Sequence, residues 1–378
     1  MNPRVHAIGG SLIREIAAKK KPSSIDLGLG EPTLLPSMQY WKDAIDQTAA
    51  HGLKYTVNAG DERLRETIAA HYAYPHMKSA QNVCVMTGSQ EAVFVLMKTL
   101  LDPGKDELLV VEPAFPAYAK MAKLEGVTVS TVAMDAGDGF AFDAQRILGA
   151  VTNKTRMIVI CSPCNPTSRV IGRATVDEIS KTLLARPGEP VYVLHDEIYR
   201  EQTFIDDAGS FGANYPHTVV TNSLSKSNAL TGLRLGWTIA PDALAPSIVK
   251  AHAWVTSCAS TFAQRVARTI FTTPHALQEH AQWYRDQGAA VTEALAACGL
   301  RYIRPEGSFY ACVALPAGVS SLQAAHDLAD RHDVIAVPGV AFGESFEGWM
   351  RLSWVAPIAQ VREGINRIAT YCAQEVRD

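Results

Sequence analysis

The feature that most constrains this chain is a regular alternation of short apolar runs with helical patterns between residues 82 and 240. The apolar runs are nearly continuous in valine, isoleucine and leucine, which is typical of strands covered on both faces. Helical stretches such as 91–101 and 176–185 separate several of them, and this order predicts an α/β layer with a largely parallel sheet. Seven strands are expected, at residues 82–86, 107–111, 127–132, 156–161, 191–196, 218–223 and 235–240.

The pattern changes from about residue 275. A long helical run at 275–299 leads into short strands, and a final helix is expected at 358–376. The short strands are expected around residues 308–315, 334–339 and 349–355. We therefore predict a large α/β domain at residues 46–280 and a smaller α+β domain built from both chain ends, residues 1–45 and 281–378.

Composition narrows the classes of protein. A chain of 378 residues with 47% hydrophobic and 19% charged residues is long enough for two folded domains. The net charge of −3 argues against nucleic acid as the main partner. No segment approaches the roughly 20 apolar residues of a membrane span, so a cytoplasmic protein is expected.

The cysteines predict neither a disulfide framework nor a metal site. Seven cysteines are scattered through the chain, which is typical of reduced core residues. Cys161 and Cys164 have C-x-x-C spacing, but prolines stand where a helix would begin and no second pair exists.

Ligands of parallel sheets bind at the carboxyl ends of the strands, so the residues that follow each strand are the candidates for chemistry. After the strand at 82–86, Gly88 opens a turn and a helix is expected to begin at Ser89 or Gln90. The backbone N–H groups there can bind an anion, although a plain serine N-cap is the simpler alternative. The segment matches neither a phosphate-binding P-loop nor a dinucleotide-binding fingerprint.

Asp196 stands at the end of the strand at 191–196, with Tyr199 three residues later. A buried carboxylate needs a cationic partner, and a protonated heterocyclic nitrogen would serve. Asn165 follows another strand in a proline-rich turn, and Phe115 lies in a similar turn where it could stack on a flat ring. A turn former and a core aromatic are the simpler interpretations of these two residues.

The segment 219–237, VVTNSLSKSNALTGLRLGW, places polar side chains between two apolar runs. Ser223 and Ser225 could donate to an anion that Arg234 clamps. Lys226 would lie beside that anion site with apolar flanks, and such surroundings lower the pKa of an amine and leave it nucleophilic. With the strand-end residues above, these groups match the phosphate, ring nitrogen, ring hydroxyl, ring face and aldehyde of pyridoxal 5'-phosphate.

The chain resembles the class I/II aminotransferase family of fold-type I pyridoxal-phosphate enzymes. The family signature S-x-S-K-x(5)-G-x-R-x-G is matched by Ser223, Ser225, Lys226, Gly232, Arg234 and Gly236. The motifs GLGEP (28–32), TGSQEA (87–92), CNPT (164–167), DEIY (196–199) and MRLSW (350–354) follow in the family's order, so the resemblance covers nearly the whole chain.

The resemblance implies roles for individual residues. Lys226 resembles the lysine that forms the Schiff base, Asp196 the partner of the ring nitrogen, and Phe115 the stacking aromatic. Asn165 and Tyr199 match the residues that hydrogen-bond the ring hydroxyl. The phosphate site is matched by Ser89, Gln90, Ser223 and Arg234, and Tyr55 resembles a tyrosine that reaches the phosphate of a neighbouring subunit. Arg351 is similar to the arginine that binds the substrate carboxylate, and Gly30 would line the same pocket.

The sequence departs from the family pattern at two positions. Ser168 and Ser308 stand where the family usually has glycine, in N-P-T-G and G-G-F-Y. If either position takes a positive φ, serine costs local strain there. The departures bear on loop shape and substrate preference more than on the reaction.

The resemblance implies a homodimeric enzyme that moves an amino group between an L-amino acid and a 2-oxo acid. The alternatives are a carbon–sulfur β-lyase, a decarboxylase or a non-catalytic binding module of the same fold. The sequence does not identify the amino donor, because no second arginine can be assigned to a side-chain carboxylate.

Overall fold

The computed structural model describes residues 2–376 and contains a large seven-stranded sheet. The strand order is β2-β8-β7-β6-β5-β3-β4, and β8 alone runs antiparallel to its neighbours. The carboxyl ends of the other six strands therefore meet at one edge. The strands are β2 (Val83–Met86), β3 (Glu107–Glu112), β4 (Thr128–Ala133), β5 (Thr155–Cys161), β6 (Tyr192–Asp196), β7 (Thr218–Ser223) and β8 (Gly236–Ile239).

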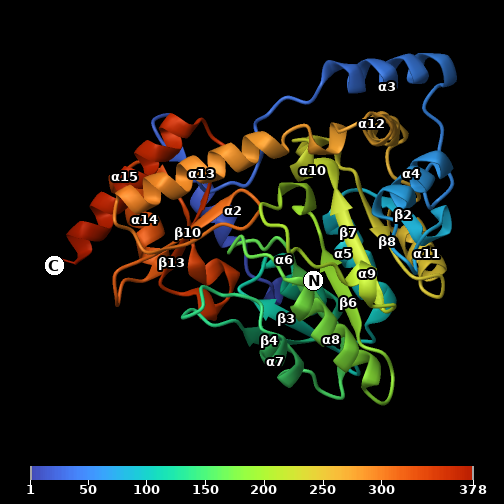
Figure 1. The fold of residues 1–378 in the computed structure, drawn as a ribbon, viewed down its shortest axis with the longest axis horizontal. Coiled ribbons are helices and arrows are strands. Elements are labelled where there is room, and N and C mark those ends of the chain that lie inside the picture. Colours follow the sequence, from blue (N-terminus) through green and yellow to red (C-terminus); the bar gives the residue numbers. More distant parts are fainter. Residues whose placement is uncertain (1, 377–378) are drawn as a thin grey trace.

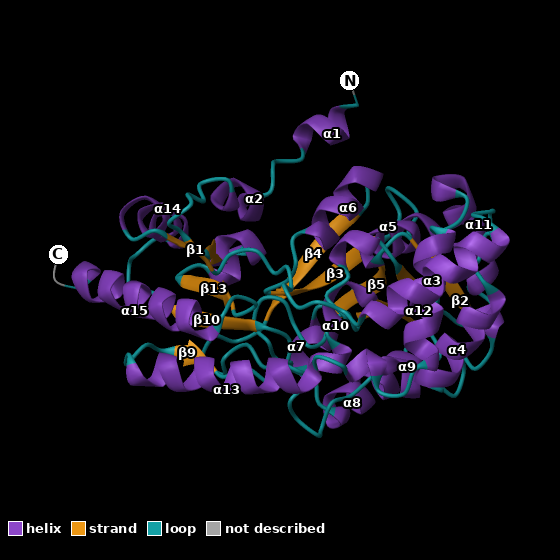
Figure 2. Cartoon of the chain, turned by 90° about the horizontal axis from the view of Figure 1, so that it is seen from above, coloured by secondary structure: helices purple, strands orange, loops and turns teal. Residues whose placement is uncertain are grey.

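All seven strands expected from the sequence are present, and helices cover both faces of the sheet (Figures 1 and 2). Successive strand residues point to opposite faces, so Leu108 and Val110 pack into one hydrophobic cluster and Leu109 and Val111 into another. One face carries α5 (Ser89–Leu100), α6 (Ala117–Glu125) and α11 (Ala245–Thr256). The other carries α4 (Glu62–Tyr72), α7 (Ala144–Gly149), α8 (Arg173–Ala185), α9 (Phe211–Asn214) and α12 (Thr261–Thr272).

A smaller antiparallel sheet lies beside the large one, in the order β12-β13-β10-β9 (Figure 1). A parallel pair, β1 and β11, joins the N-terminal part of the chain to the C-terminal part through the partners Ile25 and Val334. The strands are β1 (Ile25–Asp26), β9 (Tyr302–Ile303), β10 (Tyr310–Ala314), β11 (Val334–Ile335), β12 (Val337–Pro338) and β13 (Trp349–Ser353). The remaining helices are α1 (Pro3–Ala7), α2 (Leu12–Ala17), α3 (Met38–His51), α10 (Leu224–Ser227), α13 (Ala281–Ala297), α14 (Ser321–Arg331) and α15 (Ile358–Glu375).

Three details differ from the sequence expectations. β4 is an edge strand and is only partly buried, although its apolar sequence predicts a strand covered on both faces. The helical run expected at 275–299 is interrupted: a short 3-10 helix, Ala276–Gln278, precedes α13. The expected domain boundary at residues 45 and 46 falls inside α3, which packs against α12. The division into two domains stays a prediction.

Candidate active site

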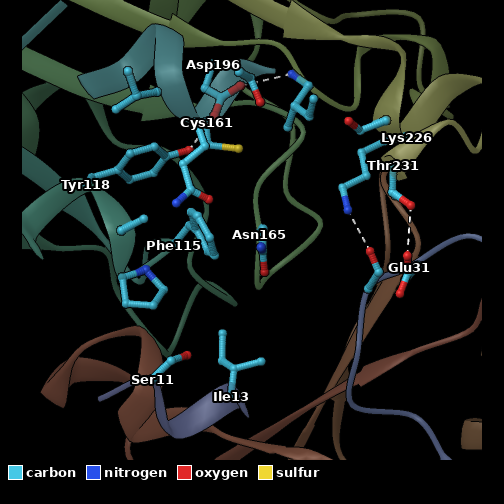
Figure 3. A pocket seen from close by; sticks show the side chains of 18 of the residues that line it. Ser11, Ile13, Glu31, Phe115, Tyr118, Cys161, Asn165, Asp196, Lys226 and Thr231 are labelled. Atoms are coloured by element: carbon cyan, nitrogen blue, oxygen red, sulfur yellow. Dashed lines mark hydrogen bonds between the residues drawn. The ribbon is translucent and has the colours of Figure 1, made fainter. Parts of the chain in front are cut away.

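A cavity of about 670 Å³ lies at the edge of the large sheet where the six carboxyl ends meet (Figure 3). All of the expected site residues except Ser223 and Tyr55 line it. They are Gly30, Ser89, Gln90, Phe115, Asn165, Asp196, Tyr199, Lys226, Arg234 and Arg351. The topology explains the assembly, because Phe115, Asn165, Asp196 and Lys226 lie at or just after the ends of β3, β5, β6 and β7.

One end of the cavity is built to bind an anion. Gly88 has φ +86° and immediately precedes α5, so the first N–H groups of that helix face the cavity. The Arg234 guanidinium lies so close that a Cβ on Gly88 would be 2.6 Å from its Nη2. Arg234 makes no ion pair with any residue in 2–376, and its Nη1 donates only to the carbonyl of Thr231 at 2.9 Å. A phosphate group fits this combination of free N–H groups and a free guanidinium.

Asp196 is a buried carboxylate on the wall of the same cavity. It accepts hydrogen bonds from the Tyr118 hydroxyl at 2.6 Å and from the Ile198 backbone N–H at 3.2 Å. Burial raises the pKa of Asp196 to about 6, against these two hydrogen bonds, which lower it. No lysine, arginine or histidine of the described chain forms an ion pair with it. The carboxylate therefore suits a ligand that brings its own N–H cation.

Lys226 lies in α10, directly after β7, and points toward the N-terminal segment (Figure 3). Its Nζ donates to the Gly30 carbonyl at 2.6 Å and lies 5.8 Å from the centre of the Phe309 ring. Burial, followed by the charges of Arg351 and Arg234, lowers the pKa of Lys226 to about 8, although Glu31 acts in the opposite direction. A substantial share of the amine is therefore neutral near pH 8, which is the form that attacks a carbonyl.

Arg351 lies on β13, between the partners Cys312 of β10 and Val337 of β12, and is 2% exposed. Its Nη1 donates to Asn165 Oδ1 at 2.9 Å and its Nη2 donates to the Gly28 carbonyl. The Nε has no partner, and no carboxylate of the described residues pairs with this guanidinium. A carboxylate that enters the cavity would supply the missing charge.

Tyr310 lies against Arg351, and Tyr199 lies against Tyr310. The ring of Tyr310 lies 4.3 Å from the Arg351 guanidinium carbon, and its hydroxyl lies 3.0 Å from that of Tyr199. Burial raises the pKa of Tyr199 well above its ordinary value, so this phenol stays protonated and can donate. Gly30 is required here, because a Cβ at that position would lie 2.0 Å from the Tyr310 hydroxyl oxygen.

The two expected residues that do not line the cavity have other surroundings. Ser223 is fully buried and its hydroxyl accepts the N–H of Ser225 at 3.2 Å, which caps α10; its neighbour Ser225 lines the cavity instead. Tyr55 is 88% exposed and lies at a separate small cavity. A role for Tyr55 at a phosphate of this same chain is therefore not supported.

Sequence reasoning missed two residues of the wall, Tyr118 and Tyr310. Tyr118 stands three positions after the expected Phe115, and Tyr310 two positions after Ser308, but only the folded chain shows that one reaches Asp196 and the other Arg351. Cys161 also lines the cavity, and burial raises the pKa of its thiol well above the ordinary value, so it is not activated as a nucleophile.

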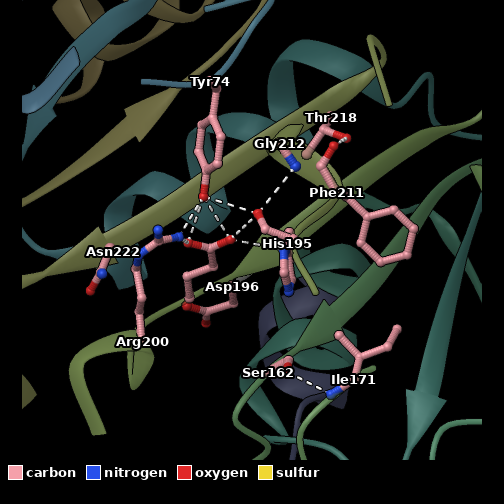
Figure 4. Close-up of polar contacts among 12 residues, drawn as sticks. Tyr74, Ser162, Ile171, His195, Asp196, Arg200, Phe211, Gly212, Thr218 and Asn222 are labelled. Atoms are coloured by element: carbon pink, nitrogen blue, oxygen red, sulfur yellow. Dashed lines mark hydrogen bonds and ion pairs between the residues drawn. The ribbon is translucent and has the colours of Figure 1, made fainter. Parts of the chain in front are cut away.

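Behind Asp196, a buried polar network holds the end of β6 (Figure 4). Glu197 points away from the cavity and accepts hydrogen bonds from the hydroxyls of Tyr74 and Ser210 and from Arg200 Nη1, the last at 2.6 Å. His195 Nδ1 lies 3.1 Å from Glu197 Oε1. Arg200, His195 and Ser210 outweigh the effect of burial and hold the pKa of Glu197 well below its usual range.

The cavity thus fits pyridoxal phosphate at each of its functional groups. The anion end suits the phosphate, Asp196 suits the ring nitrogen, and the wall formed by Phe115 suits the ring face. The Lys226 amine is the nucleophile that an aldehyde requires.

Comparison with known proteins gives the same result. The chain matches the family model of class I and II aminotransferases over residues 22–368. It is 32% identical to an aspartate aminotransferase of Pyrococcus horikoshii, with 97% of this chain and 95% of that one covered. It is also 32% identical to an arginine–pyruvate transaminase of Pseudomonas aeruginosa, with 93% and 90% covered. The solved structure of an aspartate aminotransferase from Thermotoga maritima superposes with a TM-score of 0.91 at 28% identity and covers 98% of this chain and 99% of that one.

Proposed function

This chain belongs to the class I and II aminotransferases, pyridoxal-phosphate enzymes that transfer an amino group between an amino acid and a 2-oxo acid, and we propose that the cavity described above is where it does so. The predicted family, fold class, cofactor and reaction are confirmed by these matches. One observation carries the assignment of the site: a lysine with a lowered pKa shares one cavity with a carboxylate and two guanidinium groups that form no ion pair with any residue in 2–376.

We assign the cofactor's binding residues from these contacts. The N-terminus of α5 at Ser89 and Gln90 and the Arg234 guanidinium bind the phosphate, and Ser225 lies beside them. Asp196 pairs with the ring nitrogen, and Tyr118 holds the carboxylate in place. Asn165 and Tyr199 would donate to the ring hydroxyl, and Phe115 would cover the ring.

Bound pyridoxal phosphate supplies an electron sink that makes the Cα–H bond of the amino acid acidic. The protein supplies the base. Lys226 Nζ removes the Cα proton, which requires the neutral amine, and the lowered pKa provides a substantial share of that form near pH 8. An ionised Asp196 would favour a proton on the ring nitrogen of the bound cofactor.

Arg351 orients the substrate. Its guanidinium binds the α-carboxylate through two parallel hydrogen bonds, which fixes the plane of the amino acid. Asn165 Oδ1 and the Gly28 carbonyl already hold the guanidinium, so little side-chain freedom is lost when substrate binds.

The enzyme acts as a homodimer in this proposal. Large apolar side chains are exposed on residues 35–57 and on α11, elements that Figure 1 shows at the end of the molecule opposite α15. They include Leu35, Leu53, Val57 and Trp254, the last 88% exposed. Apolar exposure on this scale marks a protein interface. Tyr55 lies among them, so its hydroxyl is free to reach the phosphate site of a second copy.

We also assign the enzyme to the cytoplasm. All seven cysteines are free thiols, five of them buried, which suits a reducing compartment. Within the described chain, no helix is long and apolar enough to span a bilayer. Fractionation of cells that carry a tagged chain tests this assignment, since recovery in any other compartment would contradict it.

A single-turnover experiment tests the proposed function. Cofactor-loaded enzyme is mixed with each of the common amino acids without an acceptor, and the products are identified. We expect a 2-oxo acid with the intact carbon chain of the donor, in one equivalent per site, and no ammonia or carbon dioxide. A β-lyase would release ammonia together with a shortened chain, and a decarboxylase would release carbon dioxide; either result contradicts the proposal. The same screen identifies the preferred donor.

A further inference from the structure

Two buried serines face each other where the loop after β5 meets the turn before β10. Ser168 and Ser308 are both 0% exposed, and their hydroxyl oxygens lie 2.7 Å apart. Both residues have left-handed backbones, with φ +60° and +56°. Glycine adopts this conformation without strain and serine does not, so the fold alone does not require a side chain at either position.

The donor order of the pair follows from its contacts. Ser168 Oγ also lies 2.5 Å from the carbonyl oxygen of Tyr310, which can only accept. A serine hydroxyl has one proton, so Ser168 donates it to Tyr310 and must accept the proton of Ser308. The two hydroxyls thus form a series of hydrogen bonds in one direction, in which Ser308 donates to Ser168 and Ser168 donates to the backbone carbonyl of Tyr310.

The hydrogen-bonded serine pair connects two of the residues that contact the Arg351 side chain, Asn165 and Tyr310. Ser168 follows Asn165 by three positions, and Asn165 Oδ1 accepts from Arg351. Ser308 precedes Tyr310 by two positions, and the Tyr310 ring lies against the same guanidinium. The pair therefore fixes the Asn165 turn relative to the Tyr310 strand at the point where Arg351 lies between them.

Other contacts also keep the two segments together, among them the Cys312 thiol, which donates to the Pro166 carbonyl at 3.0 Å. Glu306 accepts from Arg169 Nη1 at 2.5 Å and from the backbone N–H of Val170 at 2.9 Å. Its own N–H donates to the Ser168 carbonyl at 3.1 Å. These bonds would hold the segments in contact without the serine hydroxyls, so removal of the hydroxyls should change local geometry and not the fold.

We infer that Ser168 and Ser308 are positioning residues for substrate binding: their hydroxyl pair holds Asn165 and Tyr310 at the separation that keeps Arg351 aimed at the substrate carboxylate. The inference rests on the proposed role of Arg351. The strain of two left-handed serines persists because the hydroxyls serve this contact, which glycine cannot make.

The test uses cofactor-loaded enzyme and three variants, Ser168→Gly, Ser308→Gly and the double variant. Each single variant should raise KM for the amino donor about tenfold, the loss expected for one well-placed hydrogen bond. The double variant should raise KM by the same factor as each single variant, and not by the product of the two single factors. Both changes break the same series of hydrogen bonds, so their effects are not independent. We expect kcat to change less than about threefold, the cofactor spectrum to stay the same, and thermal stability to be equal or higher, since glycine relieves the strain.

Two readouts do not depend on turnover. Calorimetric titration with the 2-oxo acid released from the best donor should show a dissociation constant raised by about the same factor. A crystal structure of Ser168→Gly should show Arg351 Nη1 displaced from Asn165 Oδ1 beyond hydrogen-bonding distance. Ala73→Gly is the control: Ala73 is exposed, has φ +48° at the end of α4, and does not line the cavity, so the change relieves similar strain without an effect on KM.

Unchanged KM and dissociation constants in both single variants would overturn the inference and leave the pair a structural contact. Multiplicative effects in the double variant would also overturn it, because the serines would then act separately. The Arg351→Lys variant distinguishes failure of this inference from failure of the proposed function. If Arg351→Lys leaves KM unaltered, Arg351 does not bind the substrate, and the proposed role of Arg351 is wrong whatever the serine variants show.

Discussion

Burial moves the two ionisable groups at the centre of the site in opposite directions. The pKa of Asp196 rises to about 6 and the pKa of Lys226 falls to about 8, in each case because the cavity disfavours the charged form. The carboxylate still ionises at neutral pH, while the amine is close to losing its proton. These opposite shifts suit the two roles: Asp196 must stay charged to pair with the cofactor, whereas Lys226 must be neutral to attack the aldehyde and to accept a proton.

Asp196 gives a prediction for the cofactor-free protein. An acid whose pKa is higher in the folded state binds more protons there, so its contribution to stability falls as the pH rises from about 4 to about 6. Asparagine does not ionise, so Asp196→Asn removes this loss of stability at higher pH. The cofactor-free variant should therefore gain free energy of unfolding over the wild type, by up to about 3 kcal/mol at pH 7 and by little at pH 4. Urea denaturation at the two pH values measures it. A constant difference between wild type and variant would show that Asp196 does not titrate in this range.

Arg351→Lys tests the substrate carboxylate. Lysine keeps the charge but cannot form two parallel hydrogen bonds from one plane. Removal of such a charge-assisted pair costs about 2–5 kcal/mol, or roughly 30- to several-thousand-fold in affinity. We expect KM to rise steeply for every amino acid and 2-oxo acid, with the cofactor spectrum unchanged. Loss of thermal stability with an unchanged KM would instead identify Arg351 as part of a structural ion pair.

At the scale of elements, β6 shows how one strand serves the site and the core at once. Successive residues alternate between faces, so Asp196 enters the cavity while His195 and Glu197 enter the polar network behind it (Figure 4). The network fastens the strand end to α9 and to the segment after α4 through Ser210 and Tyr74. The position of Asp196 therefore depends on groups that never contact a ligand.

Glu197→Gln should destabilise the protein by about 1.5–3 kcal/mol at pH 7, because the partly exposed Arg200 guanidinium and the buried hydroxyls lose a charged hydrogen-bond partner. The pKa of Glu197 is lower in the folded state, so its stabilising effect is present above about pH 4.3 and is lost as the pH falls below that value. In urea titrations the difference between variant and wild type should shrink as the pH falls from 5 to 3. Asp46→Asn, at the exposed Lys42–Asp46 pair, is the control and should leave the free energy of unfolding nearly unchanged. A difference that does not depend on pH would contradict the ionised network.

The elements also show what the sequence can predict. Strands β2 to β8 were predicted because buried strands carry continuous apolar runs, and the strand-end rule placed Asp196, Asn165 and Lys226 correctly at one edge. The break before α13 was missed because the helical pattern continues through His275, although the backbone there takes a left-handed φ of +61° that ends the helical run. The bond between Ser168 and Ser308 joins residues 140 positions apart, and no local pattern indicates such a contact. The same holds for Tyr118 and Asp196.

At the scale of the whole molecule, the cavity is complete only because distant segments meet. Gly30 comes from the N-terminal segment, Lys226 from the large sheet and Arg351 from the small one. The Lys226–Gly30 hydrogen bond joins the first of these segments to the second, and the Arg351–Asn165 bond joins the third to the second. Movement of the small sheet relative to the large one would therefore open or close the substrate site directly.

The proposed dimer predicts complementation between two damaged parents. In a mixture of Tyr55→Phe and Lys226→Ala proteins, a heterodimer carries one site with both changes and one with neither. Activity should therefore recover after the subunits are exchanged under mild denaturation, up to about a quarter of the wild-type level for random pairing with inactive parents. The Lys226→Ala parent mixed with wild type is the control for exchange. A fully active monomer in sedimentation, or exchange without recovery, would contradict shared sites.

The central claim is that this fold delivers one lysine, Lys226, to the aldehyde of pyridoxal phosphate, and covalent mapping tests it most directly. The protein is loaded with pyridoxal phosphate, reduced with borohydride, digested, and analysed by mass spectrometry. We predict one modification per chain, on the peptide that contains Lys226, and none in the Lys226→Ala variant, although that variant keeps the residues that bind the phosphate. Stoichiometric modification of any other lysine, or a stable reduced adduct in Lys226→Ala, would contradict the account.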